Sequence, residues 1–355
     1  MHDLQDFFAR FAYPLAEFSQ MSRAVGKRAD YVQGGGGNTS VKLGDDLMAI
    51  KASGYHLNDV MPASGYAVLQ GRALRDFYIS GQPAEYPDVE KAGAERARGL
   101  TLQVPGLIAL RPSVEAGFHS LLKRFVIHSH SIYANLAACS ERAQEVTEET
   151  LGDAPYGHVL VPYVDPGAML TFTIRDALSN AEKEGKEKPS VLLMQNHGLI
   201  VHADTAQECL ALHEDVNRRF MRWFDLGTGT FPIPQVVPDG TGFVSATPWL
   251  AERLTGDAHP DSVLLDEPLY PDQMVFFQGS LGVKAHVDRQ TGKVRYHDMT
   301  QRAALTLEET LCAVVFIRET LLRKDLHPVS MGEAARAFIS GWESEKYRKS
   351  LTEKK

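Results

Sequence analysis

The segment Arg124-Phe-Val-Ile-His-Ser-His-Ser131 determines how the rest of the chain can be interpreted. The three residues after Arg124 are aromatic or β-branched, which predicts a buried strand. Side chains two residues apart project from the same face of a strand, so His128 and His130 face the same side. Two imidazoles placed in this way indicate a metal site.

A third histidine completes this candidate site. His197 lies in Gln195-Asn-His-Gly198, directly after the apolar run Val191-Leu-Leu-Met194, and therefore stands at the end of another predicted strand. Three histidines with one open position describe a catalytic zinc site rather than a closed structural one. Each histidine alone could instead be an inert, hydrogen-bonded residue at a strand end. The H-x-H pair together with His197 favours the metal site over that alternative.

Composition limits the possible partners. A chain of 355 residues with 44% hydrophobic content can form a large core and more than one average domain. Its net charge of -8 and the lack of a basic stripe argue against a nucleic-acid partner and favour a small molecule. The odd, widely spaced cysteines Cys139, Cys209 and Cys312 indicate neither a disulfide framework nor a thiolate metal site. With no signal-peptide pattern and no membrane-length apolar run, we expect a soluble, cytoplasmic protein without a membrane partner.

A glycine-rich loop is the next candidate for chemistry. Gly34-Gly-Gly-Gly-Asn-Thr-Ser40 precedes a predicted hairpin over residues 41–51. Four glycines indicate either a plain flexible turn or a nest of N–H groups that approaches an anion, and the spacing matches neither a Rossmann nor a P-loop fingerprint. Polar donors beside this loop and at the end of the following strand favour a phosphate. These candidate ligands are Asn38, Thr39, Ser40, Ser53 and Gly54.

The segment Arg111-Pro-Ser-Val-Glu-Ala-Gly-Phe-His119 predicts a helix that leads into the H-x-H strand, with Ser113 as its N-cap and Glu115 in its first turn. Glu115 could simply complement the helix dipole. Because the helix leads directly to the histidines, Glu115 is also a candidate general base beside the metal. We expect His119 to be a packed or supporting histidine rather than a ligand.

The remaining pattern predicts alternating helices and strands. Helices are expected over residues 3–28, interrupted at Pro14, and over 131–139, 169–184, 205–224, 305–323 and 334–355. Strands are expected over 66–69, 159–164, 191–203, 274–277, 282–287 and 293–296. Residues 225–262 are rich in Gly, Pro and Thr, which predicts a linker. We therefore divide the chain into a main domain over 1–228, a linker or wrap over 229–262 and a C-terminal extension over 263–355.

Five motifs stand in the order of the class II aldolase/adducin family, which the chain resembles from about residue 20 to 225: Gly37-Asn-Thr-Ser40, Ser53-Gly54, Pro112-Ser113 with Glu115, His128-x-His130 and Asn196-His197-Gly198. This resemblance implies the α/β class, with a three-layer α/β/α sandwich around a central, mainly antiparallel sheet. The C-terminal region is similar to the extended aldolase module of bifunctional rhamnulose-phosphate aldolase/dehydrogenases, which implies a smaller α+β extension.

The resemblance also implies a function, the metal-dependent aldol cleavage of a ketose phosphate. It implies Zn²⁺, or another divalent ion such as Mn²⁺, on the three histidines and an acid/base role for Glu115. The phosphate cradle would comprise Asn38, Ser53, Gly54 and Ser113, in a homotetramer whose sites lie between subunits. Cleavage of a carbon–carbon bond beside a carbonyl leaves an ene-diolate, whose charge a metal can stabilise without a Schiff-base lysine.

One departure from the family pattern concerns the substrate. The fuculose-phosphate type has two successive serines at the helix start, where this chain has Ser113 and Val114, so one phosphate ligand is missing. The same site is compatible with a decarboxylase of 3-oxo-acid phosphates or an epimerase of pentulose phosphates. A non-catalytic, adducin-like binding module is the further alternative, and the three retained histidines oppose it.

Overall fold

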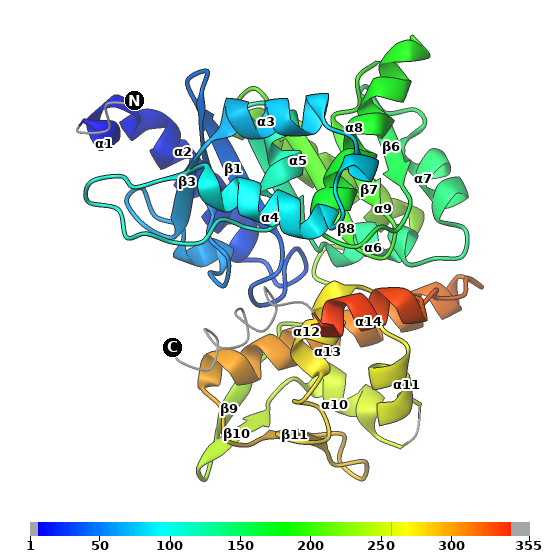
Figure 1. Cartoon of the computed structure of the whole chain (residues 1–355). Coiled ribbons are helices and arrows are strands. Elements are labelled where there is room, and N and C mark those ends of the chain that lie inside the picture. The colour runs from blue at the N-terminus through cyan, green and yellow to red at the C-terminus, as the bar shows by residue number, and fades with distance from the viewer. Residues whose placement is uncertain (1–5, 186, 257, 342–355) are drawn as a thin grey trace.

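An eight-stranded sheet forms the centre of the computed structural model, which describes residues 6–185, 187–256 and 258–341 (Figure 1). The strand order is β4-β3-β2-β1-β5-β8-β7-β6. All neighbours pair antiparallel except β6 and β7. The strands are β1 (Asn38–Leu43), β2 (Leu47–Lys51), β3 (Tyr66–Gln70), β4 (Thr101–Leu102), β5 (Phe125–Ser129), β6 (His158–Val161), β7 (Val191–Met194) and β8 (Gly198–Ala203). The predicted, mainly antiparallel sheet is thereby confirmed.

Helices cover both faces of this sheet (Figure 1). One layer comprises α2 (Ala12–Gly26), α6 (Ile132–Ala138), α7 (Ala143–Leu151) and α9 (Ala206–Trp223). The other comprises α3 (Gly71–Ser80), α4 (Val89–Gly99), α5 (Ala116–Leu121) and α8 (Ala168–Lys183). Alternation along the strands separates two apolar cores, because successive side chains enter opposite layers. The α/β/α sandwich is therefore confirmed.

Two details of the main domain differ from the prediction. The short helix α1 (Phe7–Arg10) ends before Phe11, and Pro14 lies in the first turn of α2 rather than between the helices. Proline is tolerated there because the first turn needs no N–H donor. The segment predicted as one strand over 191–203 is a hairpin, whose tight turn places Asn196 at a φ of 50°.

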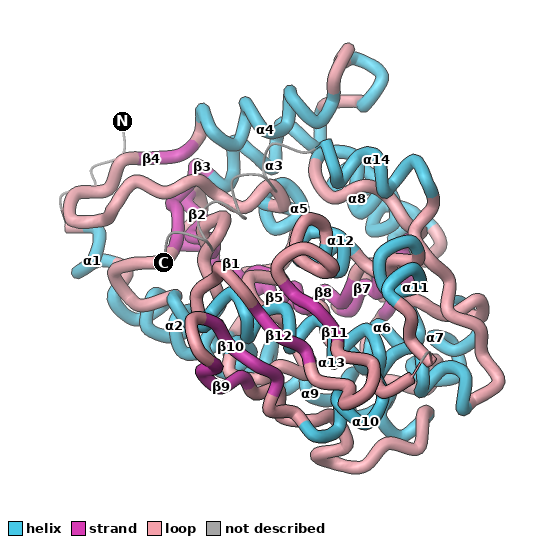
Figure 2. Tube along the Cα trace, turned by 90° about the horizontal axis from the view of Figure 1, so that it is seen from below, coloured by secondary structure: helices cyan, strands magenta, loops and turns pink. Residues whose placement is uncertain are grey.

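The segment over 229–262, predicted as a linker or wrap, contains much regular structure. It contributes β9 (Val236–Asp239), β10 (Gly242–Ser245) and α10 (Pro248–Leu254). These strands join β11 (Ala285–Val287) and β12 (Val294–Tyr296) in a second sheet with the order β11-β12-β10-β9. Figure 2 views the molecule from the end at which this sheet lies. A composition rich in Gly, Pro and Thr fits the turns of short strands as well as it fits a linker.

The predicted strand over 274–277 is also wrong, since these residues belong to α12 (Pro271–Phe277). Every residue of α12 is buried, and Pro271 occupies its first turn. A short apolar run without polar alternation fits a buried helix as well as a buried strand, so periodicity could not distinguish them. Alongside it lie α11 (Asp261–Asp266), α13 (Gln301–Arg323) and α14 (Glu333–Gly341). The remainder of the helix predicted over 334–355 falls outside the described residues.

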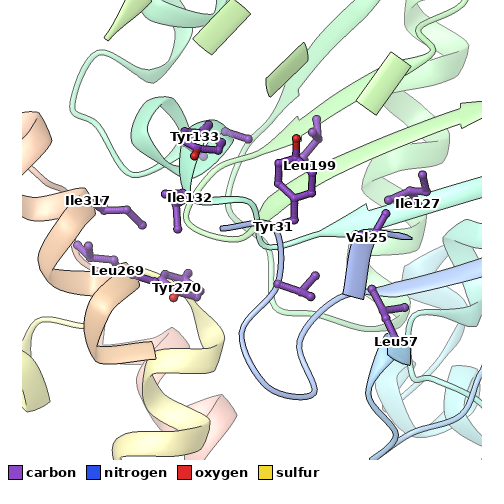
Figure 3. Packing of buried hydrophobic residues seen from close by; sticks show 14 of the residues in the cluster. Val25, Tyr31, Leu57, Ile127, Ile132, Tyr133, Leu199, Leu269, Tyr270 and Ile317 are labelled. Atoms are coloured by element: carbon purple, nitrogen blue, oxygen red, sulfur yellow. The ribbon is translucent and has the colours of Figure 1, made fainter. Parts of the chain in front are cut away.

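The extension shares a core with the main domain. Helix α13 lies between α6 on one side and the small sheet on the other. At this junction Ile132 and Tyr133 of α6 belong to the same apolar cluster as Leu269, Tyr270 and Ile317 (Figure 3). Within the described part of the chain, no helix is both long and apolar enough to cross a membrane.

Candidate metal centre

Three histidines meet at one end of the central sheet. His128 lies near the end of β5, His130 lies just beyond it, and His197 lies in the turn between β7 and β8. Because β5 and β8 are antiparallel neighbours, the turn that precedes β8 stands beside the end of β5. All three side chains are buried, and their ligand atoms lie within 4.8 Å of one another.

The hydrogen bonds of two histidines fix their tautomers. His128 Nδ1 lies 3.1 Å from the Leu199 carbonyl, and His130 Nδ1 lies 2.5 Å from Asp272 Oδ2. Both partners are acceptors, so each Nδ1 donates, and each ring, when neutral, keeps a lone pair on Nε2. Burial lowers the pKa of His128 to about 3, which keeps that ring neutral.

The two Nε2 atoms lie only 3.2 Å apart. Two lone pairs cannot form a hydrogen bond with each other, and a cation bound to both relieves the repulsion. His197 Nδ1 has no hydrogen-bond partner among the described residues, so no protein group occupies this nitrogen. The donor set therefore fits a divalent metal of the kind that imidazoles bind.

Glu115 faces the same centre. Its Oε1 lies 3.3 Å from His197 Nε2, and its Oε2 lies 3.7 Å from His128 Nε2. Burial acts to raise the pKa of Glu115, but attraction to the imidazoles in their protonated form, His128 foremost, and the contact with His197 hold it well below its usual value. An ionised carboxylate at this distance can occupy the open position of a three-histidine site or exchange a proton with a ligand there.

The helix start differs slightly from the prediction. Helix α5 begins at Ala116, so Glu115 is the residue before the helix rather than part of its first turn. The Ser113 hydroxyl accepts a hydrogen bond from the Glu115 backbone N–H at 3.3 Å, and Asn38 Nδ2 donates to Glu115 Oε2 at 2.5 Å. Both contacts hold the carboxylate toward the histidines.

A cavity beside the histidines brings four of the six predicted substrate residues together. The predicted residues that line it are Asn38, Ser53, Gly54 and Ser113. Thr39 and Ser40 do not line it, which corrects their assignment. Thr39 points to the α2 face, where its hydroxyl lies 2.6 Å from Ser22 Oγ, because neighbouring strand residues face opposite sides.

Ser40 and His119 form a supporting network behind the cavity. The Ser40 hydroxyl lies 2.7 Å from His119 Nδ1, while His119 Nε2 is hydrogen-bonded to Asn38 Oδ1. Asn38 in turn donates to Glu115. His119 is fully buried, and its ring is fully engaged in holding Asn38, which agrees with the expectation of a supporting residue.

Sequence reasoning missed Asp272, which lies 142 residues from His130 along the chain. It belongs to α12 of the extension, is fully buried, and holds the His130 ring by its Nδ1. The glycine loop approaches this pair so closely that a Cβ at Gly36 would lie 2.1 Å from Asp272 Oδ2. No local pattern marks an isolated aspartate at a helix start as part of a distant metal centre.

Comparison with known proteins identifies the family of the main domain. The family model described as the Class II Aldolase and Adducin N-terminal domain matches residues 16–223. The chain belongs to this family. The matched range ends before the small sheet, so the extension that supplies Asp272 lies outside the family domain.

Individual class II aldolase relatives are distant. A fluorothreonine transaldolase from Streptantibioticus cattleyicolor is 29% identical over 187 residues, which cover 51% of this chain and 22% of that protein. The chain thus spans about a fifth of the length of that relative. Solved structures include the N-terminal class II aldolase domain of a Thermoplasma acidophilum protein, with 23% identity, a TM-score of 0.49 and coverage of 58% of this chain and 92% of that one. An L-fuculose 1-phosphate aldolase shows 19% identity and a TM-score of 0.39, covering 63% of this chain and 92% of that one.

Proposed function

We propose that this protein is a metal-dependent aldehyde-lyase that cleaves a ketose phosphate or a related sugar derivative. One observation carries the proposal. Two imidazole Nε2 atoms face each other 3.2 Å apart, and a buried carboxylate lies 3.3 Å from the third histidine. The first feature supports a cation, and the second provides an acid/base group beside it. Membership of the class II aldolase family supports aldol-type chemistry at this site.

In the proposed reaction, His128, His130 and His197 hold a divalent ion, Zn²⁺ or Mn²⁺. When bound, the ion supplies Lewis-acid stabilisation of the negative charge that develops as a carbon–carbon bond beside a carbonyl breaks. Glu115 moves the proton at the substrate carbon, since its carboxylate opens onto the cavity. Asn38 orients Glu115 by donating to one of its oxygens, which leaves the other oxygen for the proton transfer.

The surroundings of the cavity support an anionic substrate group, although Val114 replaces a family serine. Ser53 and Ser113 line the cavity and also line an adjoining pocket that contains Arg98 and Arg111. Two arginines in the lining that these hydroxyls share can supply the positive charge that a phosphate requires. We therefore keep the phosphate in the proposed substrate.

The test combines metal content with turnover. The purified protein is expected to contain one zinc or manganese ion per chain by elemental mass spectrometry, and to release an aldehyde from a ketose 1-phosphate. His130→Ala should lose both the metal and the activity. Glu115→Gln should retain the metal and lose at least ~100-fold in kcat, the usual contribution of a positioned acid/base group. The proposal would be contradicted if the purified protein contained no zinc or manganese and gained no activity when either ion was added.

The alternative reactions on the same site are distinguished by their products. A decarboxylase would release carbon dioxide, and an epimerase would release no aldehyde, from the corresponding sugar phosphates. Mass spectrometry of the reaction mixture identifies each outcome directly.

A further inference from the structure

A second polar pocket lies at the opposite end of β1 from the metal centre. It has a volume of about 410 Å³ and is bordered by the hairpin after β1, the start of α3, the segment between α5 and β5, and β8. Its lining is strongly basic and contains Lys42, Arg72, Arg75, Lys123 and Lys188. Asp45 is the one carboxylate among the described residues that line it.

Among the described residues, two of these five cations have an ion-pair partner. Arg72 pairs with Asp46 at 3.2 Å, and Lys123 lies 3.5 Å from Asp204, both as exposed pairs that contribute little. Within the described ranges, Arg75 and Lys188 form no ion pair. The pocket therefore holds an excess of positive charge in a chain whose net charge is -8.

A buried histidine also lines this pocket. His202 is only 1% exposed, and among the described residues its ring has no hydrogen bond of good geometry, only a weaker contact with the backbone of Pro189. Burial, with Lys123 and Lys42 nearby, lowers the pKa of His202 to about 3, so its ring is neutral and offers one N–H donor.

Lys42 connects the pocket with the catalytic side of the sheet. Its Nζ donates to the carbonyls of His119 and Lys123 at 2.5 and 2.9 Å. Burial, with Arg75 nearby, lowers the pKa of Lys42 to about 7, so an anion beside it would restore its full charge.

The connection between the basic pocket and the metal centre runs along strand β1. Asn38, Ser40 and Lys42 alternate along β1 and so share one face, on which His119 of α5 packs. At the rise of a β-strand, Lys42 lies about 13 Å from Asn38, which donates to Glu115. A hydrogen-bonded path therefore joins the basic pocket to the carboxylate at the metal centre.

We propose that this basic pocket is a second anion site, which binds a small phosphorylated metabolite and influences turnover through β1. The cations surround a pocket rather than a surface stripe, and this arrangement favours a compact anion over a nucleic acid. The binding site is independent of the proposed function, whereas its influence on turnover rests on that function.

Inorganic phosphate is the probe that tests binding, by calorimetric titration of the metal-loaded protein at constant ionic strength. Arg75→Gln with Lys123→Gln should weaken phosphate binding at least tenfold. Ser53→Ala with Ser113→Ala removes the phosphate cradle at the metal centre, and Arg218→Gln with Arg222→Gln removes two exposed charges of α9. Both control pairs should retain the binding at the basic pocket.

Other results of the titration would contradict the proposed anion site. If phosphate does not bind, or if only the variant Ser53→Ala with Ser113→Ala loses phosphate binding, then the basic pocket takes no anion. Equal weakening by the α9 pair would show attraction by overall charge alone. For turnover, phosphate should change kcat at saturating substrate at least twofold in the wild type and not in the Arg75/Lys123 variant. Binding without that change would overturn the influence on turnover.

Discussion

At the scale of single residues, the metal centre depends on the groups behind the ligands. Asp272 holds the His130 ring from the side opposite the ligand atom, and the Leu199 carbonyl does the same for His128. Such partners fix the tautomer of a ligand and raise its basicity. Asp272 differs because it carries a charge and comes from the extension rather than from the family domain.

Replacing Asp272 by asparagine tests this role. Asp272→Asn keeps the size of the side chain but removes the charge, so zinc affinity should fall about 10–100-fold, as is typical for partners of metal-bound histidines. Competition with a fluorescent chelator measures the affinity, and circular dichroism checks the fold. Asp266→Asn, at an exposed position at the end of α11, is the matched control. A zinc affinity equal to that of the wild type would show that Asp272 does not support metal binding.

At the scale of secondary-structure elements, the sequence predicted those features of the site that depend only on neighbouring residues. The H-x-H pair, His197 after an apolar run and Glu115 at a predicted helix start were each visible within a few residues, and the structure brings them together. Thr39 was misassigned because strand alternation places it on the α2 face. Helix α12 and the strands β9 and β10 were missed because their short segments acquire their structure from packing against α13.

Helix α13 also contacts the glycine loop, through a buried carboxylate. Glu309 Oε2 accepts a hydrogen bond from the Gly34 N–H at 2.8 Å. Burial raises the pKa of Glu309 to about 7, although the Gly34 N–H and Arg302 act in the opposite direction. Because the folded-state pKa exceeds the unfolded value, the stability that this group contributes is complete below about pH 4.5 and declines as the pH rises through 7.

Glu309→Gln should therefore stabilise the protein at high pH only. At pH 8 the variant should exceed the wild type by on the order of 2 kcal/mol in the free energy of unfolding, and at pH 5 the two should be nearly equal. Urea denaturation at both pH values measures the difference. Glu333→Gln, at an exposed position in the first turn of α14, should change neither value. A less stable variant at pH 8 would mean that the bond from Gly34 to the carboxylate outweighs its burial.

At the scale of the whole molecule, the extension and the main domain build the site together. Asn196, beside the ligand His197, donates to the carbonyls of Leu269 and Val329 at 2.9 and 2.7 Å. Tyr270 donates to the Gln33 side chain before the glycine loop at 3.1 Å. These contacts join segments far apart in the sequence, so no local motif could predict them, and they make the metal centre depend on both parts.

Metal removal should consequently loosen part of the extension. Without the ion, the lone pairs of His128 and His130 repel each other. The hydrogen-bonded pair of His130 and Asp272 is then no longer held in place by a metal. Hydrogen exchange of the α12 amides should then accelerate at least ~10-fold, which corresponds to about 1.4 kcal/mol of lost protection. Exchange at the β9–β10 hairpin, which has no contact with the metal centre among the described residues, should stay unchanged after chelation. Uniform acceleration in both segments would indicate global destabilisation, and no change at α12 would show that the main domain holds the ion without support from the extension.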